Sequence, residues 1–151
     1  MTIPDDAAAT FGRGFNCAQS VLSSCCERYG MSREEALKVS CAFGAGMGRL
    51  GGTCGAVTGA YMAIGLKYGK CREDDEPAKE KTYALTQEFA RRFGERNGST
   101  VCRELLGLDM GTPEGMKIFK EKGYHAGRCT KYVRDAAGIV TELLDRDDLT
   151  A

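Results

Sequence analysis

The sequence predicts an all-α fold, a compact multi-helix bundle built around one central helix of small residues. Apolar residues recur at intervals of three and four along most of the chain, as they do on the buried face of a helix. Capping residues, glycines and prolines separate these segments, and no alternating pattern indicates a strand. The length of 151 residues suits a single domain, residues 1–151, that can bury a core without disulfide bonds.

The helices can be placed in order from their start and stop signals. Ser32 and Glu35 form a capping box, Pro77 suits the first turn of a helix, and Thr112 precedes another helix-starting proline. Ser99 or Thr100 is expected to cap the short helix before that one. The predicted helices cover residues 7–29, 32–44, 54–66, 77–93, 101–106, 113–122 and 126–145.

Residues 43–69 form the stretch around which the bundle is expected to be organised. Loop-forming glycines come first and are followed by an uncharged helix pattern through Leu66. Thr53 is the expected N-cap, because its hydroxyl can accept a hydrogen bond from a free backbone N–H. Gly55 and Gly59 have no side chain, so a neighbouring helix or a bound cofactor could approach the backbone there.

Composition excludes several classes of protein. Lys+Arg and Asp+Glu both number 21, so the net charge is zero. This charge gives no indication of binding to nucleic acid or to an anionic membrane. The uncharged run Leu50–Leu66 begins with glycines and contains few large aliphatic residues, so we interpret it as a buried helix without membrane insertion. The N-terminus lacks a basic region followed by an apolar stretch, and a cytoplasmic location is expected.

Four of the eight cysteines fall near predicted helix starts. Free N–H groups and the helix dipole favour a thiolate there, and the thiolate is both the nucleophile and the metal ligand. Cys54, in the first turn of the central helix, is therefore the leading reactive thiol. The candidates for catalysis and for metal binding are Cys17, Cys54, Cys102 and Cys129. Thiolates would be favoured further by basic residues nearby in the sequence, namely Arg13, Arg49, Arg103, Arg128 and Lys131.

We predict that these four sulfurs converge, either around a metal or with at least one pair at disulfide range. The other cysteines have simpler interpretations, since cysteine often packs as a small hydrophobe. Cys25 and Cys41 fall in mid-helix among apolar residues and are expected to pack in the core. Cys71 falls in a charged loop.

The same cysteines carry a resemblance that spans nearly the whole chain. Phe15–Leu22 reads FNCAQSVL, Cys54–Gly59 reads CGAVTG, Cys102 precedes the segment 104–107, ELLG, and Cys129 follows. Together these segments resemble the redox-active proteins named for the pattern C-GCAxxG-C-C. The resemblance implies a small protein with four characteristic cysteines that is redox-active or holds a prosthetic group such as an iron–sulfur cluster. It implies no particular reaction, so whether the protein is an enzyme stays open.

Local signatures of other sites are missing from the sequence. No C-x-x-C occurs, so any metal site must be assembled from distant segments. The only histidine, His125, stands four residues before Cys129 and could be a ligand or a base, although a solvated loop histidine is the commoner case. The glycine-rich stretch lacks the Lys-Ser/Thr ending of a phosphate-binding loop, which argues against a nucleotide.

Two classes of function are left by these observations. In the first, the thiols serve redox chemistry with an unknown partner protein, as ligands of an iron–sulfur cluster or metal or as a dithiol/disulfide couple. In the second, the protein is a non-catalytic binding or interaction module whose cysteines hold a structural zinc or merely pack. Four thiolates would suit either a cluster or zinc, so the number of ligands does not separate the two classes.

Overall fold

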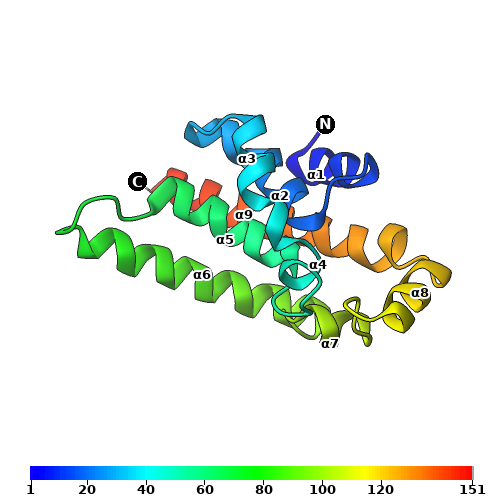
Figure 1. Cartoon of the computed structure of the whole chain (residues 1–151). Helices are drawn as coiled ribbons and strands as arrows, with labels where there is room; N and C mark the ends of the chain where they lie inside the picture. Colours follow the sequence, from blue (N-terminus) through cyan, green and yellow to red (C-terminus); the bar gives the residue numbers. More distant parts are fainter. Residues whose placement is uncertain (151) are drawn as a thin grey trace.

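The structure, a computed structural model, describes residues 1–150, and it describes side chains for residues 1–146. The part of the chain described is helical apart from turns, loops and one isolated antiparallel bridge between Thr53 and Val101, which confirms the all-α prediction (Figure 1). The elements are α1 (Ile3–Gly12), α2 (Cys17–Cys25), η1 (Cys26–Tyr29), α3 (Arg33–Ser40), η2 (Cys41–Phe43), α4 (Gly44–Met47), α5 (Gly55–Tyr68), α6 (Glu76–Asn97), α7 (Cys102–Leu106), α8 (Pro113–Glu121), η3 (His125–Cys129) and α9 (Thr130–Thr150).

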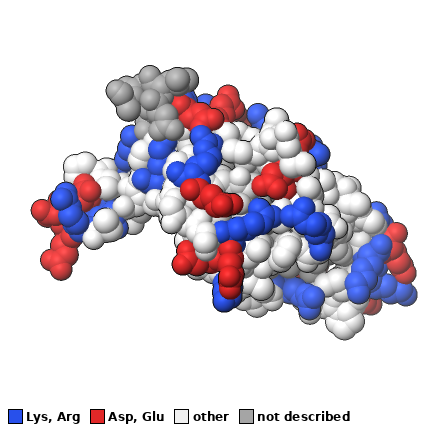
Figure 2. Space-filling model, turned by 90° about the horizontal axis from the view of Figure 1, so that it is seen from above, with Lys and Arg blue, Asp and Glu red and all other residues white. Residues whose placement is uncertain are grey.

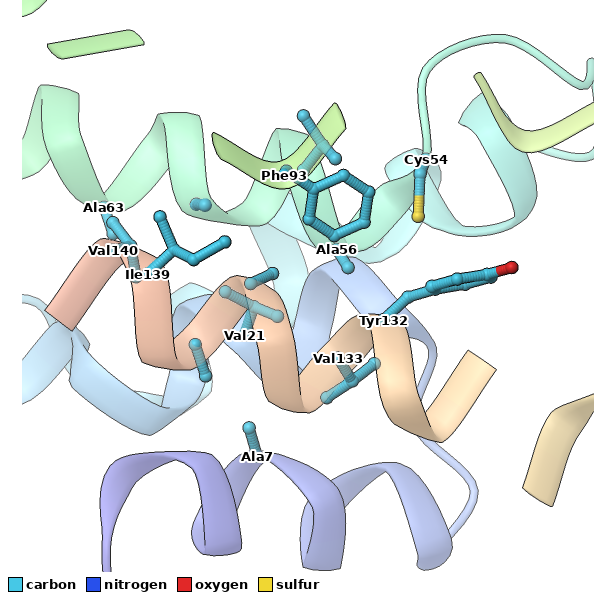
Figure 3. Packing of buried hydrophobic residues seen from close by; sticks show 14 of the residues in the cluster. Ala7, Val21, Cys54, Ala56, Ala63, Phe93, Tyr132, Val133, Ile139 and Val140 are labelled. Carbon is cyan, nitrogen blue, oxygen red and sulfur yellow. The ribbon is translucent and has the colours of Figure 1, made fainter. Parts of the chain in front are cut away.

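Helix α5 is central to the packing, as expected, and contacts α2, α6 and α9. Its alanines at 56, 60 and 63 are fully buried, and Figure 3 shows Ala56 and Ala63 facing the side chains of α9. Gly59 permits a close approach of α2. A Cβ atom there would lie 2.8 Å from the carbonyl oxygen of Ala18 and 3.2 Å from the Cβ of Val21. Helix α2 therefore packs directly against the α5 backbone.

The first predicted helix is divided in the structure. Helix α1 ends at Gly12, and the chain turns through Gly14, whose φ of +104° suits glycine. Asn16 then forms a capping box with Gln19 and starts α2 at Cys17. The prediction of one helix over residues 7–29 was wrong because this second cap makes a new start. It also places Cys17 in the first turn of a helix.

The other caps are partly as predicted. The Ser32 capping box and the Thr112 cap are confirmed, and Gly107 ends α7 in the left-handed conformation. Thr53 does not cap α5, because the N-cap residue is Cys54 and the Thr53 backbone pairs with Val101 instead. The short helix likewise starts at Cys102 after Val101, without a side-chain cap from Ser99 or Thr100.

The cysteines outside the candidate site differ in their surroundings. Cys25 is buried, as predicted. Cys41 is exposed, so the expectation that it packs in the core was wrong: α3 ends at Ser40, and the following turn directs Cys41 away from the core. Cys71 is exposed in the loop before α6.

The surface carries both signs of charge. Figure 2 shows basic and acidic side chains interspersed over one face of the molecule, without a large patch of one sign. Among residues 1–150, no helix is both long and apolar enough to cross a membrane.

Candidate functional site: a cavity lined by four cysteines

A single cavity of about 240 Å³ brings together the four cysteines singled out in the sequence. Cys17, Cys54, Cys102 and Cys129 all line it, although they come from four separate segments. The rest of the wall is mainly apolar and includes Phe11, Phe15, Leu105, Leu106, Met110, Phe119 and Tyr132. Figure 3 shows the Cys54 sulfur at the start of α5, on the side of the core where Tyr132 lies.

Main-chain pairing holds two of these cysteines at neighbouring positions. The Cys54 N–H donates to the carbonyl of Thr100 at 2.8 Å, and the Cys102 N–H donates to the carbonyl of Gly52 at 2.7 Å. These bonds flank the isolated bridge between Thr53 and Val101. The start of α5 and the start of α7 are therefore tied together, which places both thiols at the same cavity.

Cys129 reaches the cavity through a π-helical turn. Its N–H donates to the carbonyl of Tyr124 at 2.8 Å, the wide hydrogen-bond spacing of such turns, which occur frequently at functional sites. Tyr132, in the first turn of α9, donates its hydroxyl to the Leu105 carbonyl at 3.1 Å. This bond attaches α9 to α7 beside the cavity.

The thiols of Cys17 and Cys54 interact with each other at the starts of α2 and α5. The Cys54 thiol donates to the Cys17 sulfur, and this bond is the main cause that lowers the pKa of Cys17 to about 6 from an ordinary value of 9.0. Backbone N–H groups of Ala45 and Ala18 also donate to the Cys17 sulfur. The same bond, with burial and the charge on Cys17, raises the pKa of Cys54 well above its ordinary value. Within the pair, Cys17 therefore favours the thiolate and Cys54 favours the thiol.

This result corrects the sequence prediction that Cys54 carries the reactive thiolate. Cys54 is only 6% exposed and lies at the N-cap rather than in the first turn, so it keeps its proton. Cys17 is half-buried and receives the hydrogen bonds from the backbone. Of the two thiols, Cys17 is therefore the one whose pKa favours the thiolate.

The remaining two thiols at the cavity are protonated. Burial, with the Cys17 charge as the second cause, raises the pKa of Cys102 to about 11 and that of Cys129 to about 12. The positive charges of Arg103 and Arg128 oppose this rise only in part. The cavity thus holds one thiolate among three thiols.

Most of the basic side chains expected to favour thiolates have other partners. Arg128 donates to the carbonyls of Leu105 and Leu106, and Lys131 binds Asn97 and Asp135. Arg13 donates to Thr10, and Arg103 to Gly51. Hydrogen bonds from the backbone and from Cys54, rather than a nearby cation, therefore account for the low pKa of Cys17.

The loop that supplies the Ala45 N–H has an unusual conformation. Residues 45–49 all have positive φ, including Ala45 at 56°, Met47 at 68° and Arg49 at 69°. The Gly48 N–H donates to the Gly44 carbonyl at 2.8 Å, so α4 is a left-handed turn. Non-glycine residues in this region cost about 1–2 kcal/mol each, and such strain clusters at functional sites. The turn places Ala45 at the cavity with Cys17, where its backbone N–H helps to lower the pKa of Cys17.

Gly55 makes room for the Cys17 sulfur. A Cβ atom at position 55 would overlap Cys17 Sγ and would lie 2.9 Å from the Phe43 carbonyl oxygen. Gly55 also lines the cavity, whereas Gly59 faces the backbone of α2 and does not line it. A cofactor-binding role for either glycine stays a prediction. Their packing roles are visible in the structure.

His125 lies at the exposed side of the cavity. Its ring stacks on Phe11 with centroids 4.0 Å apart and an angle of 11° between the planes. The side chain is exposed, and it lines the cavity along with the four cysteines. The structure thus places the only histidine beside the thiols while leaving its ring open to solvent.

The four cysteines do not form a ready metal site. Within the described part of the chain, no three Cys, His, Asp or Glu side chains gather closely enough to hold a metal ion. Metal ligation would also require Cys54, Cys102 and Cys129 to lose their protons, because the ligand is the thiolate. As they stand in this structure, the four sulfurs are therefore not arranged as the ligands of an iron–sulfur cluster or of a tetrahedral zinc.

Sequence reasoning missed several residues that shape the site. Asn16 and Gln19 form a capping box that starts α2 at Cys17, and this N-x-x-Q pattern could have been recognised. Ala45 had no such signal, because its role depends on the left-handed turn. Tyr132 was predicted only as a core residue.

These features define a small all-α protein in which four thiols line one cavity and one of them is held as a thiolate. Residues 15–143 match the model of the family described as "Putative redox-active protein (C_GCAxxG_C_C)", and the chain belongs to that family. The resemblance noted in the sequence is thereby confirmed. No curated protein and no solved structure matches the chain.

Proposed function

We propose that the protein is a thiol–disulfide redox protein in which Cys17 is the nucleophile and Cys54 is the resolving cysteine. The observation that carries this proposal is the closeness of the two cysteines: Cys17 Sγ packs against Gly55, the residue after Cys54, and the interaction between the two thiols shifts their pKa values in opposite directions. A nucleophile must be a thiolate, and its resolving partner must lie within reach. Membership of a redox-active family agrees with this assignment.

The proposed reaction balances with a disulfide as the oxidant. The Cys17 thiolate attacks one sulfur of the substrate disulfide, the substrate S–S bond breaks, and one substrate half leaves as a thiolate that takes a proton from solvent. Cys54 then loses its proton and attacks Cys17 Sγ, which releases the second half. The substrate has accepted two electrons and two protons and forms two thiols, while the protein holds a Cys17–Cys54 disulfide. We propose that a reducing partner protein in the cytoplasm returns the Cys17–Cys54 disulfide to the dithiol.

The burial of the two residues supports this order of steps. Cys17 is half-buried, whereas Cys54 is 6% exposed, so Cys17 is the more accessible residue for a substrate disulfide. Attack by Cys54 on a mixed disulfide is then intramolecular, which favours it by proximity.

Trapping of the mixed disulfide tests this proposal. In a Cys41→Ser, Cys71→Ser background, which removes the two exposed thiols, a small disulfide should oxidise the protein by two thiols per chain. Adding Cys54→Ser should leave one substrate half attached to Cys17, and adding Cys17→Ser should abolish the rapid reaction. Cys25→Ser is the matched control, because Cys25 is buried away from the cavity. Equal oxidation of the Cys17→Ser protein would contradict the proposal.

A second candidate is the binding of a cluster or zinc, and the observation that favours it is the meeting of four thiols at one cavity. It requires that the sulfurs move closer together and that three further protons leave. Anaerobically purified protein separates the candidates: visible absorption would support a cluster, and one equivalent of zinc in colourless protein would support the binding module. Colourless, metal-free protein with rapid thiol–disulfide exchange is the result expected from the redox couple.

A further inference from the structure

A second hollow adjoins the cysteine cavity on its outer side. This outer depression has a volume of about 430 Å³, and Figure 1 shows α4 and α8, which both contribute to it, at the same end of the molecule. Its lining residues are Asn16, Cys41, Gly44, Ala45, Gly48, Arg49, Met110, Met116 and Phe119. Four of them, Asn16, Ala45, Met110 and Phe119, also line the cavity that contains Cys17. The two hollows therefore share a wall.

Arg49 gives the outer depression its charge. It is the only charged residue in the lining, and no acidic side chain accompanies it. Among the side chains that the structure describes, Arg49 forms no hydrogen bond or ion pair, whereas Arg13, Arg103 and Arg128 each have a partner. Its left-handed backbone, with φ of 69°, follows the strained turn that contributes Ala45 to both hollows. An exposed cation without a partner among the described side chains thus lines the depression that adjoins the cysteine cavity.

We propose that the outer depression binds the carboxylate-bearing half of a small disulfide, with Arg49 pairing with the carboxylate while the sulfur reaches Cys17. This inference rests on the proposed function, because Cys17 must react with a disulfide. It adds the class of substrate: a low-molecular-weight disulfide that carries negative charge.

The chemistry of the lining suits such a molecule. A guanidinium group binds a carboxylate through two parallel hydrogen bonds. Met110, Met116 and Phe119 provide an apolar surface for the body of the ligand, and methionine adapts to irregular shapes. The combined volumes of the two hollows are in the range of small-molecule sites.

The charged disulfide would react through the same two displacements, first by Cys17 and then by Cys54. The Cys17 thiolate attacks the ligand sulfur nearer the cavity, the ligand S–S bond breaks, and the half at Arg49 leaves as a carboxylate-bearing thiol after taking a proton from solvent. The Cys17 mixed disulfide with the other half is then displaced by Cys54, which releases a second thiol and completes a two-electron oxidation of the protein.

Two aromatic disulfides of different charge test the inference, the dianion dithiobis(nitrobenzoate) and the neutral dithiodipyridine. The measurement is the ratio of their second-order rate constants with Cys17, in the Cys41→Ser, Cys71→Ser background. Arg49→Gln keeps a long polar side chain but removes the charge, and it should lower the ratio of anionic to neutral rates about fivefold, as expected for one local charge. Arg49→Lys should keep most of the ratio. Arg72→Gln, in the loop before α6, is the matched control and should leave the ratio within about twofold.

The dependence of the rate ratio on ionic strength gives a second readout. Raising the ionic strength should lower the same ratio in the parent protein, and this salt effect should be weaker in Arg49→Gln. An unchanged ratio in Arg49→Gln, or an equal salt effect in both proteins, would overturn the inference while leaving the proposed function in place. Failure of the neutral disulfide to modify Cys17 in the parent would instead overturn the proposed function, and the inference with it.

Discussion

The Cys54 thiol donates a hydrogen bond to the Cys17 sulfur, so a proton on the start of α5 stabilises a negative charge on the start of α2. Two substitutions separate the donor from the sulfur. Cys54→Ser retains an O–H donor, so the pKa of Cys17 should stay low. Cys54→Ala removes the donor, and the pKa of Cys17 should rise, because the main cause of its lowering is lost.

The pKa of Cys17 in both variants can be followed by thiolate absorbance or by the pH dependence of alkylation. If Cys54→Ala left the pKa of Cys17 as low as in the parent protein, the hydrogen bond would not be its cause. The backbone donors Ala45 and Ala18 would then account for it alone.

The alkylation rate of Cys17 should follow the titration of a thiol whose pKa is lowered to about 6. Because the thiolate is the reactive form, the rate should rise about tenfold per pH unit below the pKa and level off above it. Cys25, whose pKa burial raises to about 12, should react negligibly over the same range. Mass spectrometry of iodoacetamide-treated protein between pH 4 and 8 provides the measurement. A half-maximal rate for Cys17 near the ordinary cysteine pKa would contradict the assignment.

Substitutions of two glycines on α5 distinguish a packing site from an open one. Gly55→Ala places a Cβ atom against Cys17 Sγ, so we expect it to break the Cys17–Cys54 hydrogen bond and lower stability by about 1–3 kcal/mol, the usual range for overpacking. Gly65→Ala meets no atom within 4 Å and should stabilise the helix by about 0.5–1 kcal/mol. Urea unfolding measures both effects. Equal changes in the two variants would show that the backbone at Gly55 is not crowded.

The left-handed turn makes opposite predictions for adjacent residues. Ala45→Gly relieves the cost of positive φ, partly offset by the entropy that glycine loses on folding, and should stabilise the protein by up to about 1 kcal/mol. Gly46→Ala keeps φ at 68° and puts a Cβ atom 2.7 Å from the Gly52 nitrogen, so it should destabilise the protein. The thermal midpoint should therefore rise in the first variant and fall in the second. A fall in both would argue against stored strain at Ala45.

Much of the fold follows from local signals in the sequence. The capping box at Ser32, the proline at position 77 and Gly107 mark helix ends by contacts within a few residues, and the structure has them as predicted. Position along a helix also identified four cysteines that do meet at one cavity. These features depend on neighbours in the sequence, so sequence reasoning could reach them.

Which cysteine favours the thiolate depends on contacts between distant segments, so local sequence patterns could not predict it. A helix start alone suggested Cys54, but the bonds that decide its protonation come from Cys17 and from burial. The Ala45 donor needs a left-handed turn at non-glycine residues, which the nearby glycines indicated only as a loop. Cys41 was misplaced for a similar reason, since the end of α3 at Ser40 determines its exposure.

The central claim is that Cys17 and Cys54 are the two ends of one redox couple. Equilibration of the full chain in thiol–disulfide buffers of graded potential, followed by blocking of free thiols and peptide mapping, identifies the bond that forms. The account predicts a Cys17–Cys54 disulfide that appears and disappears in a single two-electron transition, with Cys102 and Cys129 still present as thiols. A reversible oxidation that pairs other cysteines and leaves Cys17 and Cys54 reduced would contradict it.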